Sequence, residues 1–204
     1  MYQFEQALYK QHITLIAGVD EAGRGPLAGP VVAAAVILKK DATFTYVNDS
    51  KQLTEKERLL ALEEIKANAL AIGIGISSVE EIDRINIYRA SREAMLSAIQ
   101  QLKIKPQYVL SDAMPMELDI PMQSIIKGDQ KSVSIAAASI IAKTTRDQYM
   151  LEMDKLFPLY GFAKHKGYPT KDHVDAIRAY GPTPIHRKSY EPIKSMLKKT
   201  LFDV

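Results

Sequence analysis

The chain has 204 residues, of which 47% are hydrophobic and 25% charged, and it contains no cysteine. This length is sufficient for one complete hydrophobic core, or for a domain of about 150 residues with a small appendage. The lack of cysteine excludes disulfide bonds and thiolate metal sites, and polar residues interrupt every apolar run before the roughly 18 residues that a membrane span requires. The N-terminal sequence MYQFEQALYKQH lacks the apolar segment of a signal peptide, so we expect a cytoplasmic protein.

The net charge of +3 conceals an uneven distribution. Residues 143–204 contain 12 Lys and Arg against 7 Asp and Glu, whereas residues 1–142 contain 15 against 17. A basic C-terminal third beside an acidic remainder suits a protein that binds a polyanion partly through its C-terminal residues. Charge excesses of this size also occur on ordinary solvated helices, so both interpretations stay open.

In chain order, residues 1–12 predict a short amphipathic helix. Two apolar runs follow at 15–19 and 31–38, both rich in β-branched residues and bounded by Gly and Pro, which predicts two buried strands. Asp20 and Glu21 begin the loop between them. Two adjacent acids within an apolar region lose solvation and repel each other unless a cation or hydrogen-bond donors compensate.

The glycine-rich loop after the acid pair allows four interpretations. Residues 23–28, GRGPLA, match the dinucleotide-binding pattern G-x-G-x-x-A, but Gly29 and Pro30 interrupt the helix that this pattern needs. A phosphate-binding Walker loop is weaker still, because Arg24 and Gly25 stand where Lys and a hydroxyl residue are required. The other interpretations are a metal-binding acid pair followed by a loop that exposes its backbone, and an exposed turn between two strands.

Beyond this loop, predicted helices alternate with apolar strands. Two capping-box pairs, Thr54 with Glu57 and Ser78 with Glu81, indicate helix starts. The predicted elements are a helix over 54–69, a strand over 70–76, a helix over 87–102, strands over 107–110 and 123–126, and helices over 132–156, 171–180 and 190–201. The alternation predicts an α/β domain over residues 1–156, with a helical substrate-binding appendage over 157–204 packed on it.

Asp112 and Asp129 each follow a short apolar strand, as Asp20 does. We therefore expect several carboxylates along one edge of a sheet, where open α/β sheets usually bind ligands. For Asp129 alone, a structural Gly-Asp turn is the competing interpretation. Carboxylates without Cys or a repeated His pattern form a hard oxygen site that suits Mg²⁺ or Mn²⁺ rather than Zn²⁺. Such sites typically hold two ions about 3.5–4 Å apart and act on phosphoryl groups, which predicts phosphodiester hydrolysis.

Six motifs together resemble bacterial ribonuclease HII, a family of type 2 ribonucleases H. They are DEAGRGPLAGPVVAAAVIL at 20–38, NDSKQL at 48–53, SD at 111–112, KGD at 127–129, SIAAASIIAK at 134–143 and HKGYPT at 165–170. The resemblance implies a ribonuclease H-like mixed β-sheet flanked by helices, with a small helical C-terminal region. It also implies a monomeric endonuclease that acts on RNA–DNA hybrids and on duplex DNA with embedded ribonucleotides. Such enzymes cut on the 5′ side of the ribonucleotide by two-metal-ion catalysis and leave a 3′-hydroxyl and a 5′-phosphate.

The resemblance also implies roles for individual residues. The four acids of its motifs match the family's catalytic ligands for two Mn²⁺ or Mg²⁺ ions: Asp20, Glu21, Asp112 and Asp129. Two further motifs match the loop that recognises the ribose 2′-hydroxyl and the tyrosine that packs against that sugar: Gly23, Arg24 and Gly25, and Tyr168. Residues of the NDSKQL motif are candidates for phosphate contact, or else form a solvated loop before the next helix: Asn48, Ser50 and Lys51.

The basic residues near the C-terminus offer two more candidates for phosphate contact, Arg187 and Lys188. His165 and His186 stay outside the predicted catalytic set, because lone histidines in loops are usually structural or exposed.

Two other classes of protein share part of this pattern. A module that only binds RNA–DNA hybrids would use the same glycine loop but would show no metal-dependent turnover. A nuclease of the resolvase or transposase type would need the acids but neither the GRG loop nor the GYPT stretch, and it should cut all-DNA substrates.

Overall fold

The computed structural model of the protein describes residues 1–48 and 53–199. Within these ranges, five strands form one mixed sheet in the order β3-β2-β1-β4-β5. The strands are β1 (Ile16–Ala22), β2 (Val31–Leu38), β3 (Ala69–Ser77), β4 (Tyr108–Asp112) and β5 (Met122–Ile125). β2 pairs antiparallel with both β1 and β3, whereas β4 is parallel to β1 and β5 is parallel to β4. The expected mixed sheet is therefore confirmed.

Strand β1 is longer than the predicted strand, which ended at Val19. It continues to Ala22 because β2 keeps pairing with it, so that Asp20 lies opposite Ala34 and Glu21 opposite Ala33. Both acids therefore belong to the strand rather than to the loop. The pleat of a strand directs neighbouring side chains to opposite faces, so the Asp20 and Glu21 side chains leave the backbone in opposite directions.

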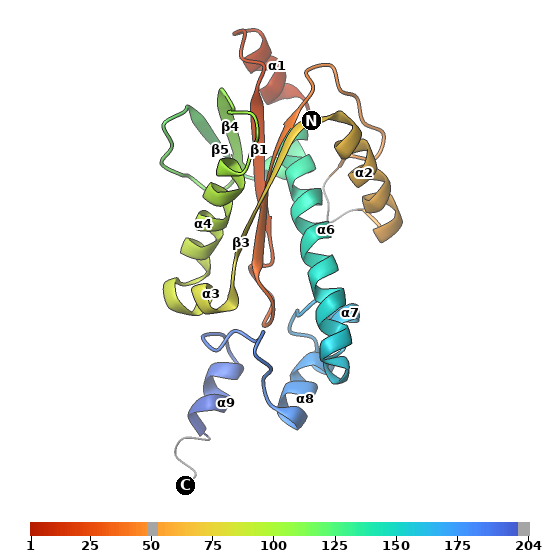
Figure 1. The fold of residues 1–204 in the computed structure, drawn as a ribbon, viewed down its shortest axis with the longest axis vertical. Helices are drawn as coiled ribbons and strands as arrows, with labels where there is room; N and C mark the ends of the chain where they lie inside the picture. The colour runs from red at the N-terminus through yellow and green to blue at the C-terminus, as the bar shows by residue number, and fades with distance from the viewer. Residues whose placement is uncertain (49–52, 200–204) are drawn as a thin grey trace.

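Helices cover both faces of the sheet (Figure 1). On one face, α4 (Ile87–Gln100) contributes Ala94 and Met95 to an apolar cluster with Val19 of β1. On the other face, α6 (Val133–Leu156) and α2 (Glu55–Asn68) pack against alternate residues of β2. Among the described residues, no helix has the length and apolar character needed to cross a membrane.

The start of α6 lies very close to β1 because the residues at their contact are small. A Cβ atom on Gly18 would lie 2.0 Å from the carbonyl carbon of Ser134. The N-terminal end of α6 is also tied to α1 (Gln3–Tyr9): the buried Glu5 side chain accepts hydrogen bonds from the Ser132 hydroxyl (2.5 Å) and the Ser134 N–H (3.0 Å). This carboxylate helps to cap the helix, because it satisfies the Ser134 N–H, which lacks a partner within the first turn.

The two capping boxes predicted from sequence are present. The Thr54 hydroxyl accepts a hydrogen bond from the Glu57 N–H at the start of α2, and Ser78 does the same for Glu81 at the start of α3 (Val79–Ile85). In both cases the glutamate side chain returns a bond to the capping residue's N–H, which fixes where each helix begins.

The helices that follow α6 in the chain lie beyond its C-terminal end (Figure 1). They are the short helix η1 (Pro158–Tyr160), α7 (Phe162–His165), α8 (Lys171–Tyr180) and α9 (Ile193–Lys199). Their apolar residues form a cluster with the last turns of α6 and with Leu27 and Ala28 of the loop between β1 and β2. Because α6 contributes to this cluster as well as to the sheet, the expected division at residue 156 stays a prediction.

The last helix begins later than predicted. The sequence indicated a helix over 190–201, but α9 begins at Ile193, and residues 200–204 lie outside the described part of the chain. Pro192 accounts for the difference, since the residue before a proline is pushed out of helical backbone geometry.

Substitution of Gly18 by alanine tests the close contact between β1 and α6. The added Cβ meets helix backbone rather than a flexible side chain, so α6 must move away from the sheet. We expect Gly18→Ala to lower the free energy of unfolding by about 1–3 kcal/mol, measured by urea denaturation. In the control Gly25→Ala, the Cβ meets nothing closer than 3.7 Å. Equal stability losses in the two variants would contradict this account of the contact.

Candidate active site

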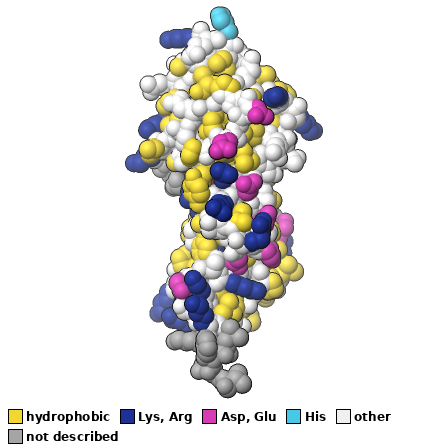
Figure 2. Space-filling view, turned by 90° about the vertical axis from the view of Figure 1, so that its left-hand side faces the viewer, with side chains coloured by type: hydrophobic (Ala, Val, Ile, Leu, Met, Phe, Trp, Pro, Cys, Tyr) yellow, Lys and Arg dark blue, Asp and Glu magenta, His cyan; other side chains and the backbone are white. Residues whose placement is uncertain are grey.

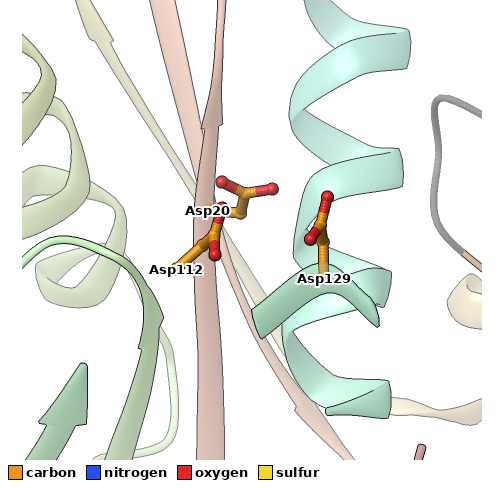
Figure 3. A group of neighbouring side chains, drawn as sticks. All are labelled: Asp20, Asp112 and Asp129. Atoms are coloured by element: carbon orange, nitrogen blue, oxygen red, sulfur yellow. The ribbon is translucent and has the colours of Figure 1, made fainter. Parts of the chain in front are cut away.

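Three aspartates from three different elements meet beside the neighbouring strands β1 and β4. Asp20 lies in β1, Asp112 ends β4, and Asp129 belongs to α5 (Gly128–Lys131). One carboxylate oxygen from each residue lies within 4.8 Å of those from the other two. Figure 3 shows Asp129 approaching the other two from the short helical turn beside them. The three aspartates thus lie together, but only Asp112 ends a strand: Asp20 lies within β1 and Asp129 in a helical turn.

Local backbone geometry places each of these aspartates. β1 and β4 are parallel and paired as far as Val19 and Ser111, so the next residue of each strand is an aspartate at the same level. After β5 the chain reverses through Lys127, which adopts left-handed backbone angles (φ 57°). The Gly128 N–H then donates to Asp112 Oδ1 at 2.7 Å, which holds α5 against the end of β4.

Burial makes this group electrostatically unfavourable when its members are ionised. Asp20 is 5% exposed and Asp129 is 2% exposed. Loss of solvation raises the pKa of Asp20 well above its ordinary value, and the charges of Glu21 and Asp112 raise it further. Hydrogen bonds from the Ser139 hydroxyl and the Glu21 N–H oppose this effect only in part.

Glu21 lies next to the three aspartates but is not part of their group. Its pKa is also raised, first by burial and then by Asp112, while the Arg24 guanidinium lowers it. Arg24 donates to Oε1 at 3.3 Å, and Oε2 is buried with no hydrogen-bond partner among the described residues. A buried carboxylate oxygen without a donor can still accept a cation. The role of Glu21 as a metal ligand stays a prediction.

The chemistry of these donors fits a divalent cation. The three aspartates offer only oxygen atoms, and their repulsion and desolvation are relieved when a positive ion lies between them. Oxygen ligands of this kind suit Mg²⁺ and Mn²⁺. The orphaned oxygen of Glu21 beside them is a fourth acceptor of the same type.

A cavity of about 430 Å³ joins three of the four predicted acids, all but Asp129, to most of the other predicted site residues. Its lining residues are Asp20, Glu21, Ala22, Gly23, Arg24, Gly25, Arg58, Asp112, Ser139, Lys143 and Tyr168. The exposed Asn48 is not among them, and the predicted contacts Ser50 and Lys51 lie outside the described residues. Arg58, Ser139 and Lys143 were missed by the sequence analysis. Ser139 and Lys143 are four residues apart and therefore share one face of α6, a spacing that is visible in the sequence.

The glycine loop and Tyr168 form one wall of this cavity. Gly23 has a φ of 101°, and a Cβ there would lie 2.2 Å from Nε of Arg146, so the residue must be glycine on both counts. Tyr168 is 43% exposed, and a ring carbon lies 3.7 Å from the place that a Cβ on Gly25 would occupy. The two sequence motifs, far apart along the chain, are therefore neighbours.

The structure corrects the prediction for Arg187. Its side chain is 0% exposed and donates to backbone carbonyl groups, so it does not contact phosphate at the surface. His165 and His186 are buried as well, and neither lines the acid cavity. Burial lowers the pKa of His186 to about 4, so this imidazole is neutral at physiological pH. Lys188 is exposed, and its predicted phosphate contact stays a prediction.

Comparison with known proteins gives consistent matches. The family described as Ribonuclease HII matches residues 17–193. Ribonuclease HII of Bacillus cereus (strain Q1) is 55% identical over 199 residues, which cover 98% of this chain and 77% of the Bacillus protein. The Geobacillus sp. (strain WCH70) protein of the same name is 53% identical over 198 residues, covering 97% of this chain and 72% of that protein. The crystal structure of ribonuclease H2 from Pyrococcus horikoshii OT3 superposes with a TM-score of 0.78 at 26% identity, covering 92% of this chain and 99% of that one.

The raised pKa of Asp20 predicts how stability depends on pH when metal is removed. A raised pKa means that the folded protein binds this proton more tightly than the unfolded chain does. The resulting stabilisation is complete below the ordinary pKa of 3.8 and is lost as pH rises through the higher folded value. In chelator, we therefore expect Asp20→Asn to raise the free energy of unfolding near neutral pH by about 0.5–2 kcal/mol and to flatten its fall with pH. Urea denaturation across a pH series measures both effects.

The control for this experiment is Asp119→Asn, at an exposed position that belongs neither to the acid group nor to the cavity lining. It should change stability by less than about 0.5 kcal/mol. If Asp20→Asn destabilises the metal-free protein at neutral pH, the carboxylates do not repel one another as described.

Proposed function

This chain belongs to the ribonuclease HII family, and from that membership and its site we propose that it cuts RNA in RNA–DNA hybrids and duplex DNA that contains ribonucleotides. The cut falls on the 5′ side of a ribonucleotide and leaves a 3′-hydroxyl and a 5′-phosphate. The observation that carries this proposal is the shared cavity of about 430 Å³, in which the carboxylates of Asp20, Glu21 and Asp112 lie beside the glycine loop and Tyr168, with Asp129 next to two of them. Reaction chemistry and sugar recognition are thus available within one site.

Asp20, Glu21, Asp112 and Asp129 would hold two divalent ions, Mg²⁺ or Mn²⁺. Ions bound there would supply an activated water and would stabilise the charge on the phosphate and on the leaving oxygen. The protein's own contribution is to keep the three aspartates close together, with Glu21 beside them, and largely out of water. The Ser139 hydroxyl and the backbone N–H groups of Glu21 and Gly128 hold Asp20 and Asp112 in fixed orientations.

The glycine loop and Tyr168 are suited to recognise the sugar. Glycine lets backbone donors and acceptors approach a ribose closely, and the 2′-hydroxyl is the group that distinguishes a ribonucleotide from a deoxyribonucleotide. The exposed ring of Tyr168 offers a flat surface against which a sugar can pack, next to Gly25. We therefore assign Gly23, Arg24, Gly25 and Tyr168 to substrate recognition.

Positive side chains on the cavity wall favour a phosphate backbone. Arg58 of α2 and Lys143 of α6 both line the cavity, and Asp147 forms ion pairs with each of them, at 3.9 Å and 2.5 Å. Asp147 thereby holds two cations at the wall where a polyanion would lie. Asn48, Ser50 and Lys51 remain proposed phosphate contacts, as do a monomeric state and a cytoplasmic location.

Cleavage of a duplex DNA that carries one ribonucleotide tests this proposal directly. We expect a single cut on the 5′ side of the ribonucleotide with Mg²⁺ or Mn²⁺, no cut in chelator, and no cut of the matched all-DNA duplex. Asp20→Asn should abolish cleavage while binding to a hybrid remains measurable, because the substitution removes a ligand oxygen's charge without removing the cavity. Cleavage of both duplexes would indicate a nuclease that ignores the ribose. Binding without any cleavage would indicate a recognition module.

Replacement of Tyr168 tests the assignment of sugar recognition. Loss of the ring in Tyr168→Ala should lower kcat/KM on the one-ribonucleotide duplex by roughly tenfold, the equivalent of one lost stacking contact. The exposed position means that thermal stability should change little. Tyr168→Phe keeps the ring and serves as the control, with activity near that of the unaltered protein. An unchanged kcat/KM in Tyr168→Ala would remove this residue from the site.

A further inference from the structure

Arg187 is a buried cation whose partners belong to the glycine loop. Its Nη2 donates to the Gly23 carbonyl at 2.6 Å and to Gly29 at 2.8 Å, and its Nη1 donates to the Arg24 carbonyl at 3.0 Å. The Nε atom donates to Gly29 as well, at 3.0 Å. The Tyr190 hydroxyl strengthens this arrangement, because it donates to the Arg24 carbonyl at 2.8 Å. Burying a guanidinium is costly, so its neutral carbonyl partners must be held in place to solvate it.

The same segment of chain runs beside the far end of the loop. The Arg187 N–H donates to the Leu27 carbonyl, and the Gly29 N–H donates to the Ile185 carbonyl, both at 2.8 Å. Ala28 and His186 form an isolated β-bridge between these bonds. The backbone around Arg187 is therefore fixed to the loop independently of its side chain, which leaves the guanidinium aimed at the carbonyls of Gly23 and Arg24.

Peptide geometry links those carbonyls to the cavity. In a trans peptide the N–H points opposite to the C=O of the same unit. Since the Gly23 and Arg24 carbonyls point at Arg187, the N–H groups of Arg24 and Gly25 point away from it. Neither N–H has a hydrogen-bond partner among the described residues, and both residues line the acid cavity. Two adjacent free donors of this kind form a receptor for an oxygen atom.

We propose that Arg187 is a positioning residue that sets the peptide orientation of the glycine loop, and thereby the preference for a ribonucleotide at the cut site. The proposal rests on the proposed function and deepens it, because it names a residue that acts through the loop without touching substrate. Lysine cannot replace it fully. An ammonium group lacks the planar fork that reaches Gly23, Arg24 and Gly29 at once.

The test compares Arg187→Lys with two further variants. Tyr190→Phe is the milder probe, since it removes only the hydroxyl that donates to the Arg24 carbonyl and accepts from Arg187 Nη1 at 3.3 Å, and leaves the guanidinium in place. Tyr160→Phe is the matched control: it removes another tyrosine bond to a carbonyl in the same C-terminal cluster, that to Gly181 at 2.6 Å, which does not involve the loop. All measurements are made at a temperature at which circular dichroism shows each variant to be folded.

Two properties are measured on the one-ribonucleotide duplex and the matched all-DNA duplex: kcat/KM with Mn²⁺, and affinity with Ca²⁺ in place of the catalytic ion. In Arg187→Lys we expect kcat/KM on the ribonucleotide duplex to fall about 10- to 100-fold, with the affinity ratio between the duplexes moving towards one. Tyr190→Phe should move both quantities in the same direction by about 2- to 10-fold, because one hydrogen bond to the Arg24 carbonyl is lost while that from Arg187 remains. Tyr160→Phe should leave both near their original values. Affinity for Mn²⁺ alone, by calorimetry, should be unchanged in all three variants.

Each outcome discriminates between the two proposals. If the unaltered protein cuts the ribonucleotide duplex selectively and both loop variants keep its affinity ratio, the role of Arg187 is overturned while the function stands. A fall in affinity for both duplexes by the same factor, or a loss of Mn²⁺ binding, assigns Arg187 a purely structural role and also overturns the proposal. If Arg187→Lys does not fold, the Tyr190→Phe result decides in the same way. An unaltered protein that cuts neither duplex overturns the proposed function itself.

Discussion

The burial of neighbouring carboxylates is the constraint on which the rest of this structure depends. Asp20 and Asp129 are almost entirely removed from water, and one oxygen from each lies within 4.8 Å of an oxygen of Asp112. Ionised acids in that arrangement raise the free energy of the folded protein, and the remainder of the core must offset the cost. Binding of a proton or of a cation would relieve this cost.

The close packing of α6 on β1 is one way in which the fold supports that arrangement. Gly18 lies two residues before Asp20 along β1. Because it has no side chain, the backbone of Ser134 and Ile135 can pack directly against it. Ser132 caps α6 immediately after α5, which carries Asp129, and Glu5 of α1 bonds to that cap. Small shifts at these contacts would therefore change the distances between the aspartates. The tight packing is thus connected to the geometry of the site as well as to stability.

Two buried arginines connect the C-terminal part of the chain to the glycine loop. Arg146 donates to the carbonyls of Ala28, Pro30 and Lys166, while Arg187 bonds to the glycine loop. The Lys166 bond fixes the turn that leads to Tyr168, and His173 contacts the Tyr168 carbonyl at 2.9 Å. The glycine loop and the turn that carries Tyr168, which line one part of the cavity, are therefore both held by buried polar side chains. The position of Tyr168 relative to Gly25 follows from these contacts.

Local physical chemistry made much of the fold predictable. Capping boxes placed the starts of α2 and α3, an apolar run predicted β2, and a helix was expected over 132–156, where α6 lies. The motifs also identified the acids, the glycine loop and Tyr168 as candidates. Pairing with β2 extended β1 through Asp20 and Glu21, an interaction between segments that no local pattern reports. The burial of Arg187 was equally unpredictable, because a charged residue in a polar loop is expected to be exposed. Its carbonyl partners lie about 160 residues away in sequence, so no local pattern indicates them. The sequence by itself determined which chemical groups this protein has and which elements carry them. Only the tertiary structure decided which groups share a cavity, because that depends on strand order and on long-range contacts between backbone and buried cations.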